Sequence, residues 1–323
     1  MARSSATASL PRVDAAKLRR LALDAQGLLR QAPFGRGRAA TLRAIEHIGY
    51  VQIDTISVVT RAHDHVLASR VPNYEPGHLD RLLADRSIFE YWYHAAAYLP
   101  MRDYRYALPR MHACRTGREH WIRSRDRKLM REVLARIAAE GPLMARDFET
   151  PPAGTTGWWN WKPAKQALEQ LFMEGELMVT GRQGFQKTYD LRERVLPEGT
   201  DTRTPTDREM ASHLLSNMLR AHGFATPKNV THLRRGQAIR GALKTVLADE
   251  VEAGALLPFR LPGGTVAYAN PDVLERRAPA ASARALLLSP FDNLVIHRDR
   301  VQSVFDFDYQ IECYLKEEDR RYG

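Results

Sequence analysis

Two polar side chains near the start of the chain have types and a spacing that could support hydrolysis. Gln52 and Asp54 are two residues apart in the stretch 50–54, where β-branched Val51 and Ile53 alternate with them. This alternation predicts a short strand or extended segment with the polar pair on one face and the β-branched pair in a core. A carboxylate in such a place could act as a base. Taken alone, a Gln-x-Asp pair is most often just the solvent face of an ordinary strand.

A second cluster of chemically active side chains is His63-Asp64-His65. As a strand it would place both imidazoles on one face, but no third ligand is identifiable nearby, so we expect no metal ion. We expect these histidines to contact a polar ligand or to cap local structure. The sequence has no Walker A loop and no GxGxxG, HExxH or GxSxG motif, so no cofactor is expected. Cys114 and Cys313 form no CxxC pattern, which excludes a disulfide scaffold and a four-thiolate zinc site.

Composition narrows the class of protein. The 323 residues are enough for two or three domains, and the hydrophobic fraction of 44% is enough for sizeable cores. Lys and Arg number 48 against 38 acidic residues, and the net charge of +10 favours polyanionic partners such as nucleic acid. No apolar run approaches the roughly 20 residues that a membrane span needs. We therefore expect a soluble protein of a reducing compartment with no membrane partner.

The elements that must position these residues are helices followed by β-hairpins, and this order occurs twice. In both copies a glycine ends the last helix before the hairpin. The predicted elements are a helix from Pro163 to Gly175 with strands at 177–179 and 187–191, then helices at 207–222 and 237–253 with strands at 256–260 and 265–269. Helices followed by a hairpin form the outline of a winged helix, whose last helix can enter the major groove of DNA.

We predict an α+β fold, mainly helical, with tandem winged-helix domains and a small C-terminal β-rich unit. The strands expected in that unit are 285–288, 294–296 and 301–307. The predicted segments are a disordered lead-in at 1–11, a first winged-helix-like domain with the Gln-x-Asp pair at 12–115, a second winged helix at 116–200, a third at 201–278 and the β-rich segment at 279–323.

Dense blocks of sequence between Gly49 and Met111, and another near the end of the chain, carry a family resemblance. The blocks are VQIDTISVV (51–59), RAHDHVL (61–67), SR (69–70), PNY (72–74), FEYW (89–92), HAA (94–96), YLPM (98–101), SPFDNL (289–294) and FDFDY (305–309). With them the chain resembles the YcaQ, or AlkX, family of bacterial winged-helix DNA glycosylases. The resemblance implies tandem winged helices around duplex DNA, removal of N-alkylated purines, unhooking of interstrand crosslinks, and a catalytic Gln-x-Asp motif at Gln52 and Asp54.

The implied chemistry suits these two residue types. A purine alkylated at N7 or N3 is positively charged, so its glycosidic bond is weakened and the leaving base needs no proton. Asp54 would stabilise the oxocarbenium-like sugar and accept a proton from water, and Gln52 would hold that water. A crosslinked base cannot rotate freely out of the duplex. We therefore expect both side chains on an exposed strand edge that faces a basic cleft.

Ten further residues are predicted to contact DNA through a positive charge, an imidazole or an aromatic ring. They are Arg61, His63, His65, Tyr91, Trp92, His94, Lys162, Lys165, Arg298 and Arg300. The aromatic run is equally typical of core packing, and each cation alone is typical of a solvated surface.

The preferred interpretation is a monofunctional, metal-free and cofactor-free DNA glycosylase. We expect it to act as a monomer on double-stranded DNA with alkylated or crosslinked purines, in the bacterial cytoplasm at the nucleoid. One alternative is a non-enzymatic winged-helix transcription regulator, in which Gln52 and Asp54 are ordinary polar residues. Another is a metal-dependent nuclease that uses Asp54, His63 and His65.

Overall fold

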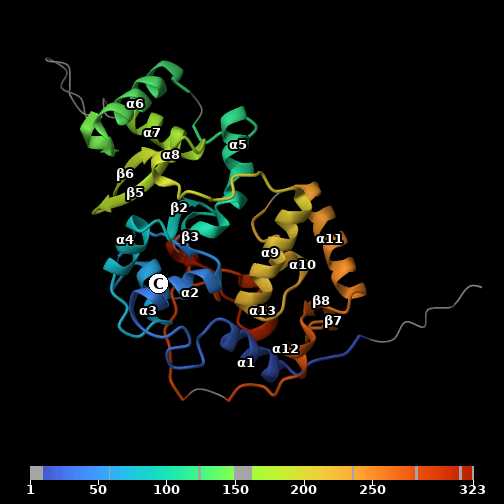
Figure 1. Ribbon diagram of the computed structural model, residues 1–323. Helices are drawn as coiled ribbons and strands as arrows, with labels where there is room; N and C mark the ends of the chain where they lie inside the picture. The colour runs from blue at the N-terminus through green and yellow to red at the C-terminus, as the bar shows by residue number, and fades with distance from the viewer. Residues whose placement is uncertain are drawn as a thin grey trace, which may run out of the picture. The chain divides into compact units, whose positions relative to one another are not determined.

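The computed structural model is an α+β fold in which helices predominate and the sheets are small (Figure 1). It describes residues 10–57, 59–122, 125–148, 162–234, 236–280, 283–312 and 315–321. Contacts divide the chain into two compact units. The inserted unit is Gly35–Thr206, and the split unit combines Met1–Phe34 with Asp207–Gly323. The predicted lead-in at 1–11 lies, up to residue 9, outside the described residues.

The described residues of the inserted unit form two antiparallel sheets of three strands each. In the first sheet the strand order is β1-β3-β2, with β1 (Val51–Gln52), β2 (Ile88–Trp92) and β3 (Ala96–Pro100). In the second the order is β4-β6-β5, with β4 (Leu143–Met144), β5 (Leu177–Gln183) and β6 (Gln186–Leu191). The helices of this unit are α2 (Gly37–Ile48), α3 (Ala62–Ala68), α4 (Gly77–Ala84), η1 (Met101–Ala107), α5 (Leu108–Thr116), α6 (Arg127–Glu140), η2 (Ala145–Phe148), α7 (Lys162–Met173) and α8 (Arg192–Val195).

Apolar faces of α2 and α4 pack on the first sheet. Ala44, Ile45 and Ile48 recur at helical spacing in α2 and are buried. In α4, Leu79 and Leu82 do the same. Burial of these faces places the edge strand β1, and with it the Gln-x-Asp segment, on a rigid base.

Two glycines fix the paths of the chain into these sheets. Gly49 ends α2 with φ of 86°, a left-handed conformation that glycine adopts without steric cost, and the chain turns there into β1. Gly175, between α7 and β5, has φ of 76°, and a Cβ atom there would lie 2.6 Å from the sulfur of Met111. Only glycine therefore fits this turn without displacing its neighbour.

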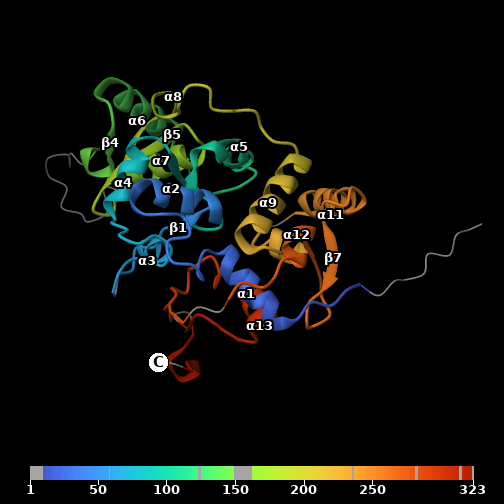
Figure 2. The same ribbon diagram turned by 60° about the horizontal axis from the view of Figure 1, so that its bottom comes forward.

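The split unit is formed from both ends of the chain. Its helices are α1 (Ala15–Ala25), α9 (Asp207–His222), α10 (Pro227–Val230), α11 (Gln237–Glu252), α12 (Pro271–Glu275), α13 (Arg298–Phe305) and η4 (Glu317–Asp319), and its hairpin is β7 (Leu257–Arg260) with β8 (Val266–Ala269). Helices α1 and α13 lie side by side in both views (Figures 1 and 2).

One core holds this unit together. Leu18 and Ala22 of α1 pack with Phe224, with Phe259 of the hairpin and with Val304 of α13. The segment 12–34, which the sequence analysis grouped with the Gln-x-Asp pair, thus packs with residues 207–323, because its apolar stripe matches a core formed there.

The helix–hairpin order expected from the sequence is present. Helix α9 has the predicted bounds, and α10, α11, β7 and β8 follow it in the element order of a winged helix. The assignment of these segments as winged helices stays a prediction. The C-terminal strands are wrong: in the described residues 283–312 and 315–321 there is no strand, and 298–305 is helix α13. Val301 and Val304 are both buried, and their spacing of three residues places them on one face of the helix. The apolar residues of this short segment do not by themselves distinguish a helix from a strand.

Candidate active site

The Gln-x-Asp segment runs along the edge of the first sheet. Val51 pairs with Tyr98 and Gln52 with Ala97, and the N–H of Ile53 donates to the carbonyl of Ala96 at 2.8 Å. Val51 and Ile53 are buried, as the alternation predicts. The expectation of an extended segment at an edge is therefore confirmed.

Gln52 is enclosed rather than open to solvent. Only 8% of the residue is exposed, and its Oε1 lies 3.0 Å from Nε2 of His94. An amide oxygen only accepts hydrogen bonds, so this nitrogen of His94 is the donor. The ring of Tyr50 stacks on that of Tyr93, with 4.5 Å between the centroids, and meets the ring of His94 edge-on. These rings separate Gln52 from solvent. The expectation that both motif side chains are exposed is wrong for Gln52, because these aromatic rings cover it.

Asp54 is half-buried, and its carboxylate is oriented by the backbone that follows it. Oδ1 accepts from the N–H of Ile56 at 2.8 Å, while the N–H of Asp54 donates to Nδ1 of His63 at 3.4 Å. The carboxylate is thus held at the point where β1 gives way to the loop before α3. A carboxylate with a fixed direction and partial access to solvent is suited to act on a bound substrate.

His63, Asp64 and His65 lie on helix α3 and not on a strand. Successive helical residues are turned by about 100°, so the two imidazoles do not share a face as expected: His63 is buried and His65 is half-buried. Burial lowers the pKa of His63, and the nearby Asp64 carboxylate, 3.8 Å away, opposes this effect. The described residues contain no group of three or more side chains that could hold a metal ion.

A small polar cavity of about 210 Å³ lies beside the motif. Its polar lining has charges of both signs, with Arg61, Arg182, His63, Asp64 and Asp80, and Phe185 lies beside them. The guanidinium carbons of Arg61 and Arg182 lie 4.1 and 5.7 Å from the centroid of the Phe185 ring. Arg61 is thereby held at a cavity beside the motif as a candidate phosphate contact, whereas the donors of Arg182 are used by Glu90 and by the carbonyl of Phe185. Arg61 was predicted from the sequence, and Arg182 was missed.

A buried carboxylate holds Arg182 in place. Glu90 of β2 has a fully buried side chain that accepts from Arg182 through both oxygens, at 2.8 and 3.0 Å, and lies 2.9 Å from Nζ of Lys187. Arg182 is 92 residues away in sequence, so no local pattern predicts the pair. One signal was present: a Glu inside the aromatic run 88–92 is a charge among core residues, which are rarely charged unless paired.

The Gln-x-Asp segment and the cavity beside it form one candidate site on the inserted unit. Comparison with known families identifies the family to which the chain belongs. A family model described as "DNA glycosylase AlkZ-like" matches residues 45–323, which include the motif and the cavity. The chain belongs to the AlkZ-like DNA glycosylase family. The resemblance seen in the sequence is thus confirmed, and the protein is an enzyme that acts on DNA.

A solved structure agrees with the family assignment. The DNA glycosylase AlkZ of Streptomyces sahachiroi matches with a TM-score of 0.62 and 16% sequence identity, over 87% of this chain and 76% of that chain. At this identity the likeness concerns the fold. Membership in the glycosylase family favours the enzyme over the regulator that the sequence had left open.

In this AlkZ-like glycosylase only part of the aromatic run is available to DNA. Tyr91 is buried, and its hydroxyl donates to the carbonyl of Met173 at 2.8 Å, so it belongs to the core and its predicted contact with bases is wrong. Trp92 is half-buried, and its ring centroid lies 4.5 Å from that of Trp121. His94 donates a hydrogen bond to Gln52.

The remaining predicted contacts differ in exposure. Lys165 is exposed on α7, whereas the side chain of Lys162 lies outside the described residues. Arg298, in the split unit, is half-buried with its guanidinium carbon 5.7 Å from the ring of Tyr309. Arg300 is 1% exposed and donates to the carbonyls of Phe224 and His222, both at 2.9 Å. A DNA contact by Arg300 is therefore wrong, because its donors are used inside the core.

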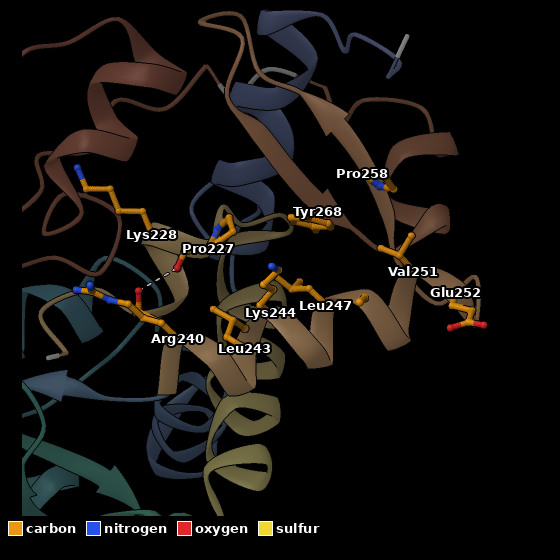
Figure 3. Close-up of a pocket in the computed structure, with 12 residues that line it drawn as sticks. Pro227, Lys228, Arg240, Leu243, Lys244, Leu247, Val251, Glu252, Pro258 and Tyr268 are labelled. Carbon is orange, nitrogen blue, oxygen red and sulfur yellow. Dashed lines mark hydrogen bonds between the residues drawn. The ribbon is translucent and has the colours of Figure 1, made fainter. Parts of the chain in front are cut away.

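The split unit of the AlkZ-like chain carries a larger groove, of about 910 Å³, between α10, α11 and the β7–β8 hairpin. Leu243, Leu247 and Val251 follow one face of α11 below Tyr268 of the hairpin (Figure 3). Lys228, Arg240 and Lys244 stand at its sides. Among the described residues no helix is long and apolar enough to cross a membrane.

Proposed function

We propose that this DNA glycosylase hydrolyses the N-glycosidic bond of cationic N-alkylated purines in duplex DNA and unhooks interstrand crosslinks. Asp54 stabilises the positive charge that develops on the sugar and accepts a proton from the attacking water. Gln52 holds that water. The observation that carries the proposal is the oriented, half-buried Asp54 carboxylate at the edge of a sheet, beside a cavity that Arg61 lines.

The properties of Asp54 match the needs of this reaction. An alkylated purine leaves as a neutral base, so the enzyme must supply negative charge at the sugar and no acid at the base. A partly desolvated carboxylate opposes a developing cation more strongly than one in water. The bond from Ile56 N–H fixes Oδ1, which spares the reaction the cost of orienting the group.

The environment of Gln52 supports its role as a water-binding residue. Because Oε1 accepts from His94, the direction of the amide is set and its NH₂ group is the end that presents donors. A water that accepts from this NH₂ keeps a lone pair for the sugar carbon and donates its proton to Asp54. His94 is in this view a positioning residue for Gln52.

The surroundings of the motif support binding of DNA and not of a free nucleoside. Arg61 lines the cavity beside the motif and is only half-buried, so its guanidinium can meet a backbone phosphate, and the net charge of the chain is +10. The exposed edge next to Asp54 also allows access to a base that stays tied to the opposite strand. Crosslink unhooking therefore requires no full rotation of the base into a closed pocket.

The test is excision from defined duplexes that carry N7-methylguanine or a nitrogen-mustard crosslink, in EDTA, followed by alkaline cleavage of abasic sites. Asp54→Asn should lower the single-turnover rate by about 10²- to 10³-fold, and Gln52→Ala by about 10²-fold. Asp85→Asn, an exposed carboxylate of the same unit, is the matched control and should retain the wild-type rate. Excision at the wild-type rate by Asp54→Asn would refute the assignment.

A further inference from the structure

The loop that joins β1 to α3 exposes two large apolar side chains shortly after Asp54 in the sequence. Ile56 is 67% exposed and Val59 is 96% exposed. Within the described part of the inserted unit they are the exposed large hydrophobic residues, while the others there are buried or half-buried. Exposure of this kind costs stability and indicates a binding role when it is concentrated at one place.

The composition of the loop strengthens this point. Between Asp54 and Arg61 the sequence is TISVVT, with no charged residue in a chain of which 27% is charged. A loop on the surface of a basic protein is usually polar. The aliphatic side chains suit contact with the faces of stacked bases and with sugar edges, and the hydroxyl groups can donate to neighbouring phosphates.

The base of the loop is fixed on both sides. At one end the N–H of Ile56 donates to Asp54, and at the other Ser57 forms an antiparallel bridge with Arg61. The guanidinium of Arg61 in turn packs over the ring of Phe185. The backbone of Ile56 is therefore tied to the Asp54 carboxylate, and the bridge between Ser57 and Arg61 joins the two ends of the turn that carries Val59.

We propose that Ile56 and Val59 form an apolar wedge that enters the duplex at the lesion and separates the stacked bases, which brings the sugar carbon to Asp54. Arg61 neutralises the phosphate at the edge of the opening. The proposal rests on Asp54 as the catalytic residue and adds how a lesion that cannot rotate out is reached. Aliphatic side chains of this kind unstack base steps in other DNA-bending proteins, at a cost of about a few kcal/mol per step.

A duplex occupant is favoured over a protein partner by position. The wedge residues lie two and five positions after the catalytic carboxylate, and the cavity beside them holds Arg61 and Arg182. A partner protein bound on this loop would cover the residue that must reach DNA. Binding of a protein at this loop would therefore block catalysis, whereas binding of duplex DNA would not.

The experiment measures unstacking separately from excision. A duplex with N7-methylguanine carries 2-aminopurine as the neighbouring base, whose fluorescence rises on unstacking, and the protein carries Asp54→Asn so that no product forms. We expect a fluorescence rise with Asp54→Asn and with Asp54→Asn/Leu287→Ser, because Leu287 is an exposed apolar residue (86%) of the other unit. The rise should be lost in Asp54→Asn/Ile56→Ser/Val59→Ser at saturating protein.

A second measurement uses excision by the protein with an intact motif. Ile56→Ser/Val59→Ser should lower the rate on a fully paired duplex by about tenfold or more. It should change the rate by less than about threefold when the lesion lies in a pre-opened mismatch bubble, where the cost of unstacking is already met. Equal loss on both substrates, or no fluorescence rise in the Asp54→Asn parent, would overturn the wedge. Failure of the proposed function looks different: Asp54→Asn would then still excise.

Discussion

The buried ion pair at Glu90 gives a sharp prediction for stability. Glu90→Gln removes the charge that Arg182 and Lys187 share while it keeps the shape of the side chain. The side chains of these two cations are only 11% and 23% exposed, so water compensates little for the loss. Removal of one partner from a buried pair costs about 3–5 kcal/mol, and the retained amide oxygen places the expected value near about 3 kcal/mol.

Tryptophan fluorescence in urea measures this loss in the relevant unit. All five tryptophans of the chain, at 92, 121, 158, 159 and 161, fall within the inserted unit, Gly35–Thr206, so their signal reports on it alone. With a urea dependence of about 2 kcal/mol per M, the midpoint should fall by about 1.5 M.

The control is an exposed pair of the same unit. Glu140 pairs with Arg136 on α6, with side chains 47% and 37% exposed, and Glu140→Gln should shift the midpoint by less than about 0.3 M. A shift for Glu90→Gln as small as that of Glu140→Gln would refute the view that the Glu90 carboxylate organises the two sheets.

Three further outcomes are expected. Burial lowers the pKa of His63 from its ordinary 6.5. At acidic pH the unfolded chain therefore binds more protons than the folded one. The contribution of the neutral His63 to the free energy of unfolding is complete above pH 6.5 and decreases as the pH is lowered from there. His63→Gln should weaken this fall in urea titrations at several pH values, and an unchanged slope would contradict it. Gly175→Ala should cost about 2 kcal/mol through its positive φ and the clash with Met111, whereas Gly241→Ala, in a helix with open space around it, should stabilise by about 0.5–1 kcal/mol; equal thermal midpoints would contradict this. Affinity for undamaged duplex should fall steeply as salt rises, and a flat titration would argue against phosphate contacts.

Local sequence patterns predicted the helices and strands whose ends are marked by characteristic residues such as glycine. Helix α9 and both hairpins were placed within a few residues, because glycines end the helices and apolar periodicity marks their faces. The strand at Gln52 followed from alternation. The prediction was wrong for two short segments, α3 and α13, which the sequence analysis assigned to strands. Two histidines or two valines close together do not distinguish the 3.6-residue period of a helix from the two-residue period of a strand.

Contacts between distant residues could not be predicted from local patterns. The burial of Gln52 depends on Tyr50, Tyr93 and His94, which meet only after β1 pairs with β3. The cavity depends on Arg182, placed by a strand more than a hundred residues after the motif. The family resemblance, and not the spacing of two residues, directed attention to the motif.

The origin of the split unit in both ends of the chain has a consequence for biosynthesis. Arg19 of α1 donates to the carbonyl of Val304, which lies 285 residues later, and Gln26 donates to that of Ala221. On the ribosome α1 emerges before the segments against which it packs. The segment between them, Gly35–Thr206, has its own cores and is completed while the rest is still being made. The unit that bears Asp54 can therefore fold before α1 meets the residues against which it packs.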